Sequence, residues 1–280
     1  MATTAFMSLY RDEWIAGFER DKTTLRETVT KESMIRGQSA VFLVAKTGSD
    51  AVTRGGNGLI PSTPLSLTQS TVTLTEKHSM KSITGFNIFA GQSNQREIMQ
   101  TMTRKEINRS IDNQIITILA TGTVTPTATA GIMTKQLVTQ ATTQLWNGFV
   151  NNDGNVWGLL TPAAWGHLSD IPEFASSDFV SAMPLTDGIP QMSPGTVKNW
   201  MGVKWMMHTG LTNAGLATAQ CYIYHRDAIG YACSSAEIQA YADYMQEQDY
   251  SWSRATVYDG SLKLQNAGIV VINHDDTQYS

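Results

Sequence analysis

Charged side chains are scarce in this chain. Of its 280 residues only 16% are charged, whereas 41% are hydrophobic. Soluble domains usually carry about a quarter charged residues, and disorder requires more charge and fewer apolar residues. The sequence therefore predicts a folded protein with a sizeable core and a surface rich in neutral Thr, Ser, Gln and Asn. Such a surface suits a protein that packs against copies of itself, but it equally suits an ordinary Thr-rich globular protein.

Cysteine and long apolar segments are also few. The spacing of Cys221 and Cys233 matches neither a CxxC redox motif nor a zinc site, so we interpret both as reduced, buried thiols. Residues 1–20 lack the continuous apolar segment of a secretory signal. The apolar runs 40–45 and 115–120 are too short to span a membrane. We therefore expect a soluble product of the cytoplasm with no membrane partner.

The sequence has no concentrated basic segment. The net charge is −4 and the isoelectric point is near 5.7, whereas dedicated nucleic-acid binders carry a basic face. Arg104, Lys105 and Arg109 are scattered in a way that is typical of the solvated face of a helix. Tight binding of nucleic acid is therefore not expected.

The common active-site motifs are missing as well. The sequence contains no phosphate loop, GxGxxG, HExxH or GxSxG pattern. The glycines of 55–58 have no accompanying lysine and no strand-to-helix context, so they predict a flexible loop tip. His274-Asp275-Asp276 is the nearest approach to a ligand cluster, but neighbouring residues at a strand end point in opposite directions. We interpret it as a polar strand terminus.

Three further carboxylates lie close together in the sequence. Asp243, Glu247 and Asp249 have the residue types needed for acid–base chemistry, but a solvated turn before a strand explains them better. We therefore expect no catalytic residues, no metal and no cofactor.

The N-terminal segment 5–35 predicts an amphipathic helical arm that ends at Gly37. Phe6, Tyr10 and Trp14 follow helical spacing, and Leu25 and Val29 continue it more weakly. The arm has little of its own subunit to pack on. Phe6, Tyr10 and Trp14 are therefore candidates for docking on a neighbour, with burial in their own core as the alternative.

A two-stranded finger is expected next, over residues 38–84. Segments 40–45 and 71–75 are rich in β-formers, and 48–66 between them is unusually long for a loop in a compact domain. A lone hairpin cannot bury both of its faces, so this finger needs a neighbour.

Residues 94–121 predict a helix roughly 40 Å long. Asn94 and Glu97 have the form of a capping box, Gly122 is expected at C′, and one face is apolar. The rest alternates strands and helices, as in an α/β or α+β domain. The expected helices are 134–150 and 162–168, and the expected strands are 156–160, 203–208, 219–224, 250–258, 262–264 and 269–272, with a hairpin turn at Asp259-Gly260.

This order of elements resembles the major capsid proteins of tailed bacteriophages with the Hong Kong 97-like fold. The segments that carry the resemblance are 10–14 (YRDEW), 25–29 (LRETV), 51–61 (AVTRGGNGLIP), 84–90 (TGFNIFA), 94–100 (NQREIMQ), 247–255 (EQDYSWSRA) and 270–275 (VVINHD). The resemblance covers nearly the whole chain, and 172–200 is its least familiar part.

The resemblance implies an α+β fold with four parts. These are an N-terminal arm (1–37), an extended β-hairpin loop (38–84), a peripheral domain with the spine helix (85–125 and 235–262) and an axial domain (126–234 and 263–280).

The resemblance also implies a non-enzymatic subunit that forms hexamers and pentamers of an icosahedral shell around double-stranded DNA. Its assembly surface would include Phe6, Tyr10 and Trp14 of the arm and Arg54, Gly55 and Gly56 of the finger. An exposed loop charge is the alternative for Arg54.

The partners implied are portal and scaffolding proteins and a decoration or cement protein. The shell would assemble in the host cytoplasm, and its final place would be the virion. Because the chain begins directly with the arm, any scaffold is expected to be a separate protein. Lys46, Lys77 and Lys81 match no cross-linking motif, so the sequence does not predict covalent cross-linking.

Three other classes of protein explain the sequence less well. An encapsulin-type compartment shares the fold and differs in its gene neighbours. A hydrolase needs convergent titratable groups, and a tail or adhesion protein usually shows β-repeats; the sequence has neither pattern.

Overall fold

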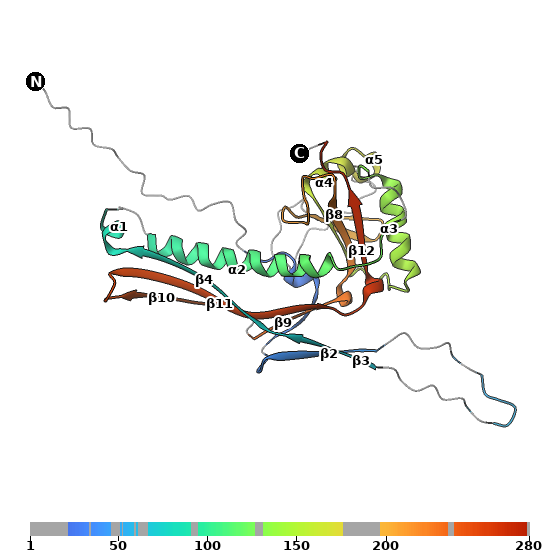
Figure 1. The fold of residues 1–280 in the computed structure, drawn as a ribbon. Helices are drawn as coiled ribbons and strands as arrows, with labels where there is room; N and C mark the ends of the chain where they lie inside the picture. The colour runs from blue at the N-terminus through green and yellow to red at the C-terminus, as the bar shows by residue number, and fades with distance from the viewer. Residues whose placement is uncertain are drawn as a thin grey trace, which may run out of the picture.

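The computed structural model describes residues 22–33, 35–45, 51, 53–58, 60, 67–90, 95–126, 131–175, 197–234 and 238–278. Within these residues the subunit has three parts, which can be followed in Figure 1. A long helix lies on an elongated sheet, a compact domain sits at one end of that helix, and a separate hairpin extends beyond the sheet.

The long helix α2 (Gln95–Leu119) confirms the expected spine. It packs along β11 (Tyr250–Lys263) and β4 (Thr75–Thr84). Its buried face repeats at helical spacing through Met99, Thr103, Ile107, Ile111 and Ile115. The short helix α1 (Gly85–Ala90) precedes it at the far end of the subunit.

Gly122 follows this helix for a different reason from the one expected. It is not among the residues with positive φ. A Cβ there would lie 2.8 Å from Ile269 Cγ2 and 3.0 Å from Val271 Cγ2. The glycine therefore allows a close approach to a neighbouring strand rather than a left-handed helix end.

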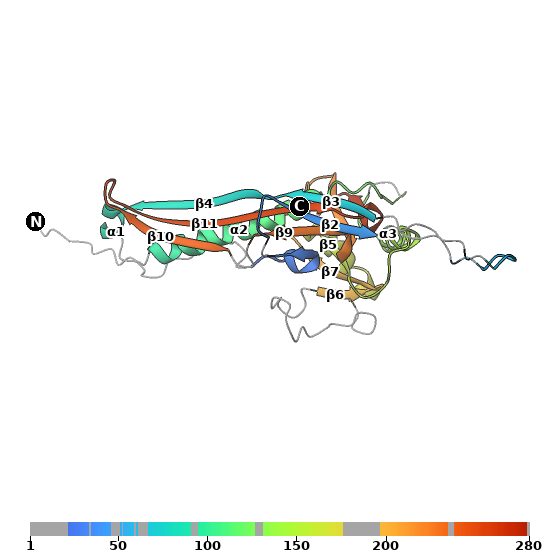
Figure 2. The ribbon, with the colours of Figure 1, turned by 90° about the horizontal axis from the view of Figure 1, so that it is seen from below.

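The elongated sheet joins β1 (Thr30–Glu32), β9 (Ile229–Cys233), β11 and β10 (Gln239–Met245), with β4 also paired to β11. Figure 2 shows β4, β11 and β10 running together along the helix. The expectation that residues 75–84 belong to the finger is wrong, because ten residues of β4 pair with β11 from Tyr250↔Thr84 to Asp259↔Thr75.

The predicted hairpin turn at Asp259-Gly260 is also wrong, because β11 runs through it without interruption. A Cβ at Gly260 would lie 2.8 Å from Thr73 O and 2.8 Å from Val72 Cγ2. The glycine lets the finger cross the strand at close range. The Asp259 side chain is buried beneath it and forms an ion pair with Lys77.

The finger consists of β2 (Ser39–Ala45) and β3 (Leu67–Thr73), which pair antiparallel from Ser39↔Thr73 to Ala45↔Leu67. Ala40, Phe42 and Val72 form a small buried cluster with Ala232 of the elongated sheet. One face of the finger base is thereby fixed to the body.

The expected arm helix does not extend through residues 22–33. This segment forms a 3₁₀ turn (Arg26–Thr28) and then β1, which pairs parallel with β9. Leu25 and Val29, which continued the helical spacing, are both fully buried in the main core. Tertiary contacts override their local periodicity. Residues 5–21 lie outside the described residues.

The compact domain contains a second sheet in the order β12-β8-β5-β7-β6. The expected strands and helices are present, with α3 ending at Asn147 and Thr134 and Thr161 capping α3 and α4. The strands are β5 (Val156–Leu160), β6 (Val197–Trp200), β7 (Val203–Met207), β8 (Ala219–His225) and β12 (Ile269–His274), and the helices are α3 (Lys135–Asn147), α4 (Pro162–Ser169) and α5 (Pro172–Ala175).

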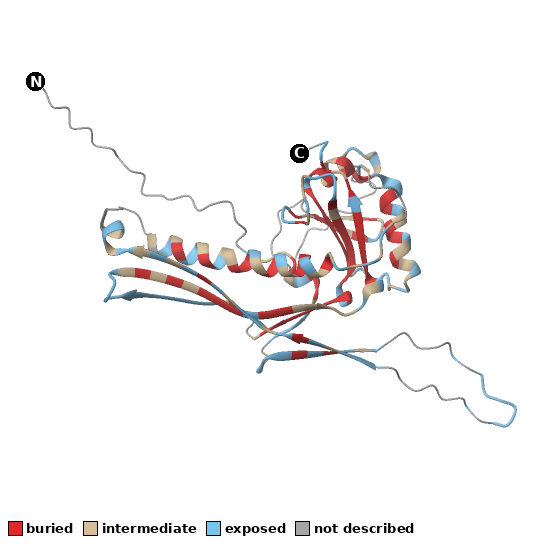
Figure 3. Cartoon of the chain, in the orientation of Figure 1, coloured by how far each residue is buried: buried red, intermediate tan, exposed pale blue. Residues whose placement is uncertain are grey.

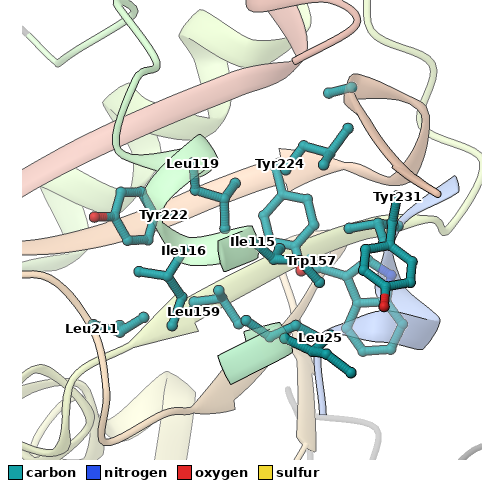
Figure 4. Close-up of a cluster of buried hydrophobic side chains, with 14 of the residues drawn as sticks. Leu25, Ile115, Ile116, Leu119, Trp157, Leu159, Leu211, Tyr222, Tyr224 and Tyr231 are labelled. Atoms are coloured by element: carbon teal, nitrogen blue, oxygen red, sulfur yellow. The ribbon is translucent and has the colours of Figure 1, made fainter. Parts of the chain in front are cut away.

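Both faces of this second sheet are buried, as the red interior in Figure 3 shows. Cys221 and Ile223 of β8 pack with α3 and α4. Tyr222 and Tyr224, which alternate with them, pack with the C-terminal part of α2. Figure 4 shows both tyrosines beside Ile115, Ile116 and Leu119. The two-residue repeat of the strand thus divides its side chains between two cores.

Replacing Gly260 with Ala is expected to lower the free energy of unfolding by about 1–3 kcal/mol, because the added methyl group overlaps Thr73 and Val72. Gly56→Ala is the matched control, since a Cβ at Gly56 meets nothing within 4 Å. Urea unfolding of the unassembled subunit measures both. Equal midpoints for the two variants would contradict the assignment.

Candidate assembly surface

The outer face of the finger exposes large apolar side chains. Leu43 is 70% exposed, Leu67 56% and Val41 46%. In the register of the hairpin, Val41 faces Thr71 and Leu43 faces Gln69, so these side chains share the face opposite the buried Ala40 and Phe42. Clustered exposed apolar side chains are typical of a surface that another protein covers.

The tip of the finger is closed by its own contacts. Arg54 Nε donates to Gly58 O over 2.7 Å, and Gly58 N donates to Gly55 O over 2.9 Å. Gly58 adopts φ +77°, which only glycine tolerates well. The structure therefore brings Arg54, Gly55 and Gly56 together on an exposed loop. Phe6, Tyr10 and Trp14 lie outside the described residues.

An ion pair between the partly buried Lys77 and the fully buried Asp259 lies where the finger crosses β11. Lys77 Nζ is 3.1 Å from Asp259 Oδ1 and also contacts Gln114 of α2. Tyr231 donates to Asp259 Oδ2 over 3.4 Å. Burial raises the pKa of the Asp259 carboxyl, and the charge and hydrogen bond of Lys77 oppose that rise. The pair joins β4, β11, β9 and the spine helix at one point.

A second carboxylate fixes the chain where it enters the core. Asp112 of α2 accepts hydrogen bonds from Thr24 N at 3.1 Å, Thr24 Oγ1 at 3.0 Å and Leu25 N at 3.2 Å. These donors begin the 3₁₀ turn at Arg26–Thr28, so the aspartate acts as its cap from another element. Sequence reasoning missed this role, although a lone Asp between Ile111 and Ile115 was a usable signal.

The histidine and carboxylates at the end of β12 divide between the interior and the surface. His274 and Asp276 are buried and Asp275 is not. Thr161 Oγ1 lies 3.0 Å from His274 Nε2 and donates to Asp276 Oδ1 over 2.8 Å. Asp276 Oδ2 also accepts from Gly215 N over 3.0 Å.

This cluster does not have the geometry of a catalytic relay. Thr161 Oγ1 and Asp276 Oδ1 both contact the same ring nitrogen of His274, Nε2. A catalytic relay instead needs the hydroxyl and the carboxylate on opposite ring nitrogens. Burial lowers the pKa of His274, and Asp276 opposes that effect. The cluster instead ties β12, α4 and the loop before β8 together.

The other carboxylates that were considered for acid–base chemistry do not come together in one site. Asp243 is on β10, and Glu247 and Asp249 follow it in the turn before β11, with Asp249 bonded to Tyr244. Across the described part of the chain, no group of three His, Cys, Asp or Glu residues is placed to hold a metal ion. No helix among the same residues has the length and apolar character needed to cross a membrane.

The long helix on an elongated sheet, the compact domain and the projecting finger are arranged as in solved structures of phage capsids. Similar solved structures include Mycobacterium phage Che8 (TM-score 0.74, 15% identity, 97% of this chain and 98% of that chain). The capsid of a native GTA particle is also similar (0.70, 14%, 96% and 95%), as is Gordonia phage Cozz (0.69, 13%, 97% and 92%). The fold is the Hong Kong 97-like capsid fold.

The chain belongs to the phage capsid protein family, whose model matches residues 2–276. No curated protein matches it. It is therefore a structural, non-enzymatic subunit of the virion capsid, and it assembles with copies of itself into the shell.

Replacing Lys77 with Met removes the cation that compensates the buried Asp259 carboxylate. A carboxyl whose pKa is higher in the folded than in the unfolded state loses stability as pH rises through that pKa. The variant is expected to lose about 3–5 kcal/mol at pH 7 and less at pH 5. Urea midpoints at both pH values measure this.

Lys81→Met is the control, since Lys81 is also on β4 but is 41% exposed and pairs with Glu106 near the surface. Its expected penalty is below about 1 kcal/mol. A Lys77→Met penalty that is independent of pH would contradict the assignment.

Asp112→Ala leaves three donors of Thr24 and Leu25 without their acceptor. We expect a loss of about 2–3 kcal/mol and faster tryptic cleavage after Arg26, measured by thermal unfolding and timed proteolysis. Asn113→Ala, the exposed neighbour on the same helix, should change neither quantity. Unchanged cleavage after Arg26 in the Asp112 variant would refute the proposed cap.

Proposed function

We propose that this chain forms hexamers and pentamers that tile an icosahedral shell around double-stranded DNA. The observation that carries this proposal is the finger, which presents Val41, Leu43 and Leu67 away from the subunit's own core. Covering such side chains contributes about 25 cal/mol per Å² of apolar area. Because the chain belongs to the phage capsid protein family, neighbouring copies of the subunit in the shell would cover these side chains.

We also propose a division into an arm, a finger, a peripheral domain and an axial domain. The two separate sheets support it. One hydrophobic core lies between the second sheet and α3 and α4, whereas the other lies around α2 and joins the elongated sheet to the opposite face of the second sheet. The strand pairing favours a finger of about 38–74, since β4 pairs within the elongated sheet. The second sheet, with β12 included, corresponds to the axial domain.

In this proposal the finger lies over a neighbouring subunit and the arm reaches across another. Arg54 at the tip is the charged contact between subunits, and its hydrogen bond to Gly58 presets the loop that carries it. Phe6, Tyr10 and Trp14 are the aromatic anchors of the arm, which suits residue types that are enriched in interface cores.

The remaining partners follow from the capsid role. Portal and scaffolding proteins, and a decoration protein, bind the shell, which assembles in the host cytoplasm. The DNA inside makes weak, non-specific contacts, since the chain carries a net charge of −4. A shell that held its genome tightly would oppose packaging and ejection.

Negative-stain electron microscopy and large-pore sizing chromatography of the purified protein test this proposal. Closed shells, open sheets, or isolated hexamers and pentamers are the expected result. A monodisperse monomer or dimer, unchanged by crowding agents and by co-expression of the phage's scaffolding protein, would overturn it.

Arg54→Ala is expected to reduce the yield of shells several-fold without changing the thermal midpoint of the free subunit, because among the described residues the hydrogen bonds of the tip lie within the tip itself. Arg36→Ala, an exposed arginine at the base of the finger, controls for a general loss of positive charge. Wild-type shell yield from the Arg54 variant would exclude the tip from assembly.

A further inference from the structure

Basic side chains gather on the side of α2 that faces away from the elongated sheet. Arg104 and Arg109 are exposed, and Lys105 between them is partly exposed. The buried face of the same helix repeats through Ile107 and Ile111 instead. At 1.5 Å per residue, the three cations span roughly 8 Å along the helix axis. They therefore form one basic stripe on the outer side of the helix.

The acidic residues of α2 do not balance this stripe. Asp112 is buried, and Glu106 pairs with Lys81 of β4 over 2.8 Å. Glu97 is the third acidic residue of the helix and is exposed. The outer side of the helix is therefore net positive, although the whole chain carries a net charge of −4.

Strand β4 shows which side of the elongated sheet faces the helix. Ser79 and Lys81 both bond to Glu106 of α2. Because successive side chains of a strand point to opposite sides, Glu76 and Met80 point away from the helix, and both are exposed. The sheet thus has one side covered by the helix and one open side.

The open side of the sheet carries charges of both signs. Ser253 of β11 contacts Thr103 of α2, so its neighbours Trp252 and Arg254 point to the open side. The guanidinium of Arg254 lies 5.9 Å from the centre of the Trp252 ring. Asp243 is exposed and pairs in register with Trp252. The two broad sides of the elongated part therefore differ in charge, and the basic one is the helix side.

We propose that the outer side of α2 lines the inside of the shell and contacts the phosphate groups of the packaged double-stranded DNA through Arg104, Lys105 and Arg109. Cations arranged along one face of a helix are the usual electrostatic footprint of a phosphate-binding surface. Contacts to phosphates carry no sequence information, so any packaged genome would fit. This inference rests on the proposed function of a shell around DNA.

Three cations in each subunit make the contact weak and dependent on salt. The logarithm of the binding constant falls by about 0.9 per neutralised phosphate for each tenfold rise in salt. Repetition of the stripe over the many copies in a shell adds these weak contacts together. Each copy can therefore release the DNA easily, while the whole inner surface still orders the outermost layer of the genome.

The first test places the photoreactive residue p-benzoylphenylalanine at position 101 of the full chain. Thr101 is exposed, one turn before Lys105 on the outer side of α2. Irradiation of DNA-filled particles should attach the subunit to DNA, which a nuclease-sensitive shift in electrophoresis would show. The same residue at position 80, on the open side of the sheet, is the control and should give several-fold less adduct. Particles emptied of DNA should give none.

Filled particles that give no DNA adduct from position 101 would overturn this inference while leaving the capsid function intact. So would equal adducts from both positions, or an adduct with another phage protein in place of DNA. Wild-type protein that forms no particles would instead overturn the proposed function itself.

The second test removes the charges. Arg104→Gln combined with Arg109→Gln should weaken binding of short duplex DNA by the free subunit several-fold at low salt, and should reduce the salt slope by about 2. Arg36→Gln combined with Arg226→Gln removes the same charge at two exposed positions outside α2 and should leave the slope unchanged. Fluorescence anisotropy measures both pairs. Equal losses in the two pairs would overturn the stripe as the binding surface.

Discussion

The burial of the second sheet's inner face against the C-terminal part of α2 is the contact on which the rest of the subunit depends. Tyr222 and Tyr224 of β8 lie there with Ile115 and Leu119 of the helix. Each such side chain contributes about 1.5–3 kcal/mol when removed from water. Because the same helix also covers the elongated sheet, this one helix fixes the position of the compact domain relative to that sheet.

Buried polar groups then set the details of that junction. Asp112 holds the entering chain to the spine helix, the Lys77–Asp259 pair joins three strands to it, and Thr161, His274 and Asp276 close the far end of the second sheet. A buried polar group is stable only when its partners are in place. These contacts therefore favour one arrangement of the elements over others that would bury equal apolar area, and a shell needs subunits of one shape.

Function in this protein is a property of surface rather than of a pocket. The low charge content leaves neutral surface that is easily desolvated, and the finger adds an apolar face that its own subunit does not cover. Glycine serves the same end at Gly230 and Gly260, where a side chain would keep the finger from approaching the sheet. The result is a body from which the finger projects.

The elements whose side chains repeat with the period of the backbone were predictable from the amino-acid sequence. The helices at 95–119, 135–147 and 162–169 and the strands at 39–45, 156–160 and 269–274 lie within a few residues of where the patterns predicted them. The exposed glycine-rich tip with Arg54 was also predictable, since glycine and the lack of apolar residues are local signals. So was the order of elements that identifies the capsid fold.

The pairing of the strands and the burial of particular carboxylates could not be predicted in this way, because both depend on contacts between distant parts of the chain. Residues 75–84 have a strand pattern that fits the finger equally well, but β11 offers ten partners. Asp259-Gly260 is a turn signal locally, and it became mid-strand because the finger crosses there. Leu25 and Val29 do not form the predicted helix but lie in the core that packs against α2. Asp112 of that helix accepts a hydrogen bond from the backbone amide of Leu25. In each case contacts distant in sequence outweighed a local preference, which amounts to less than about 1 kcal/mol per residue.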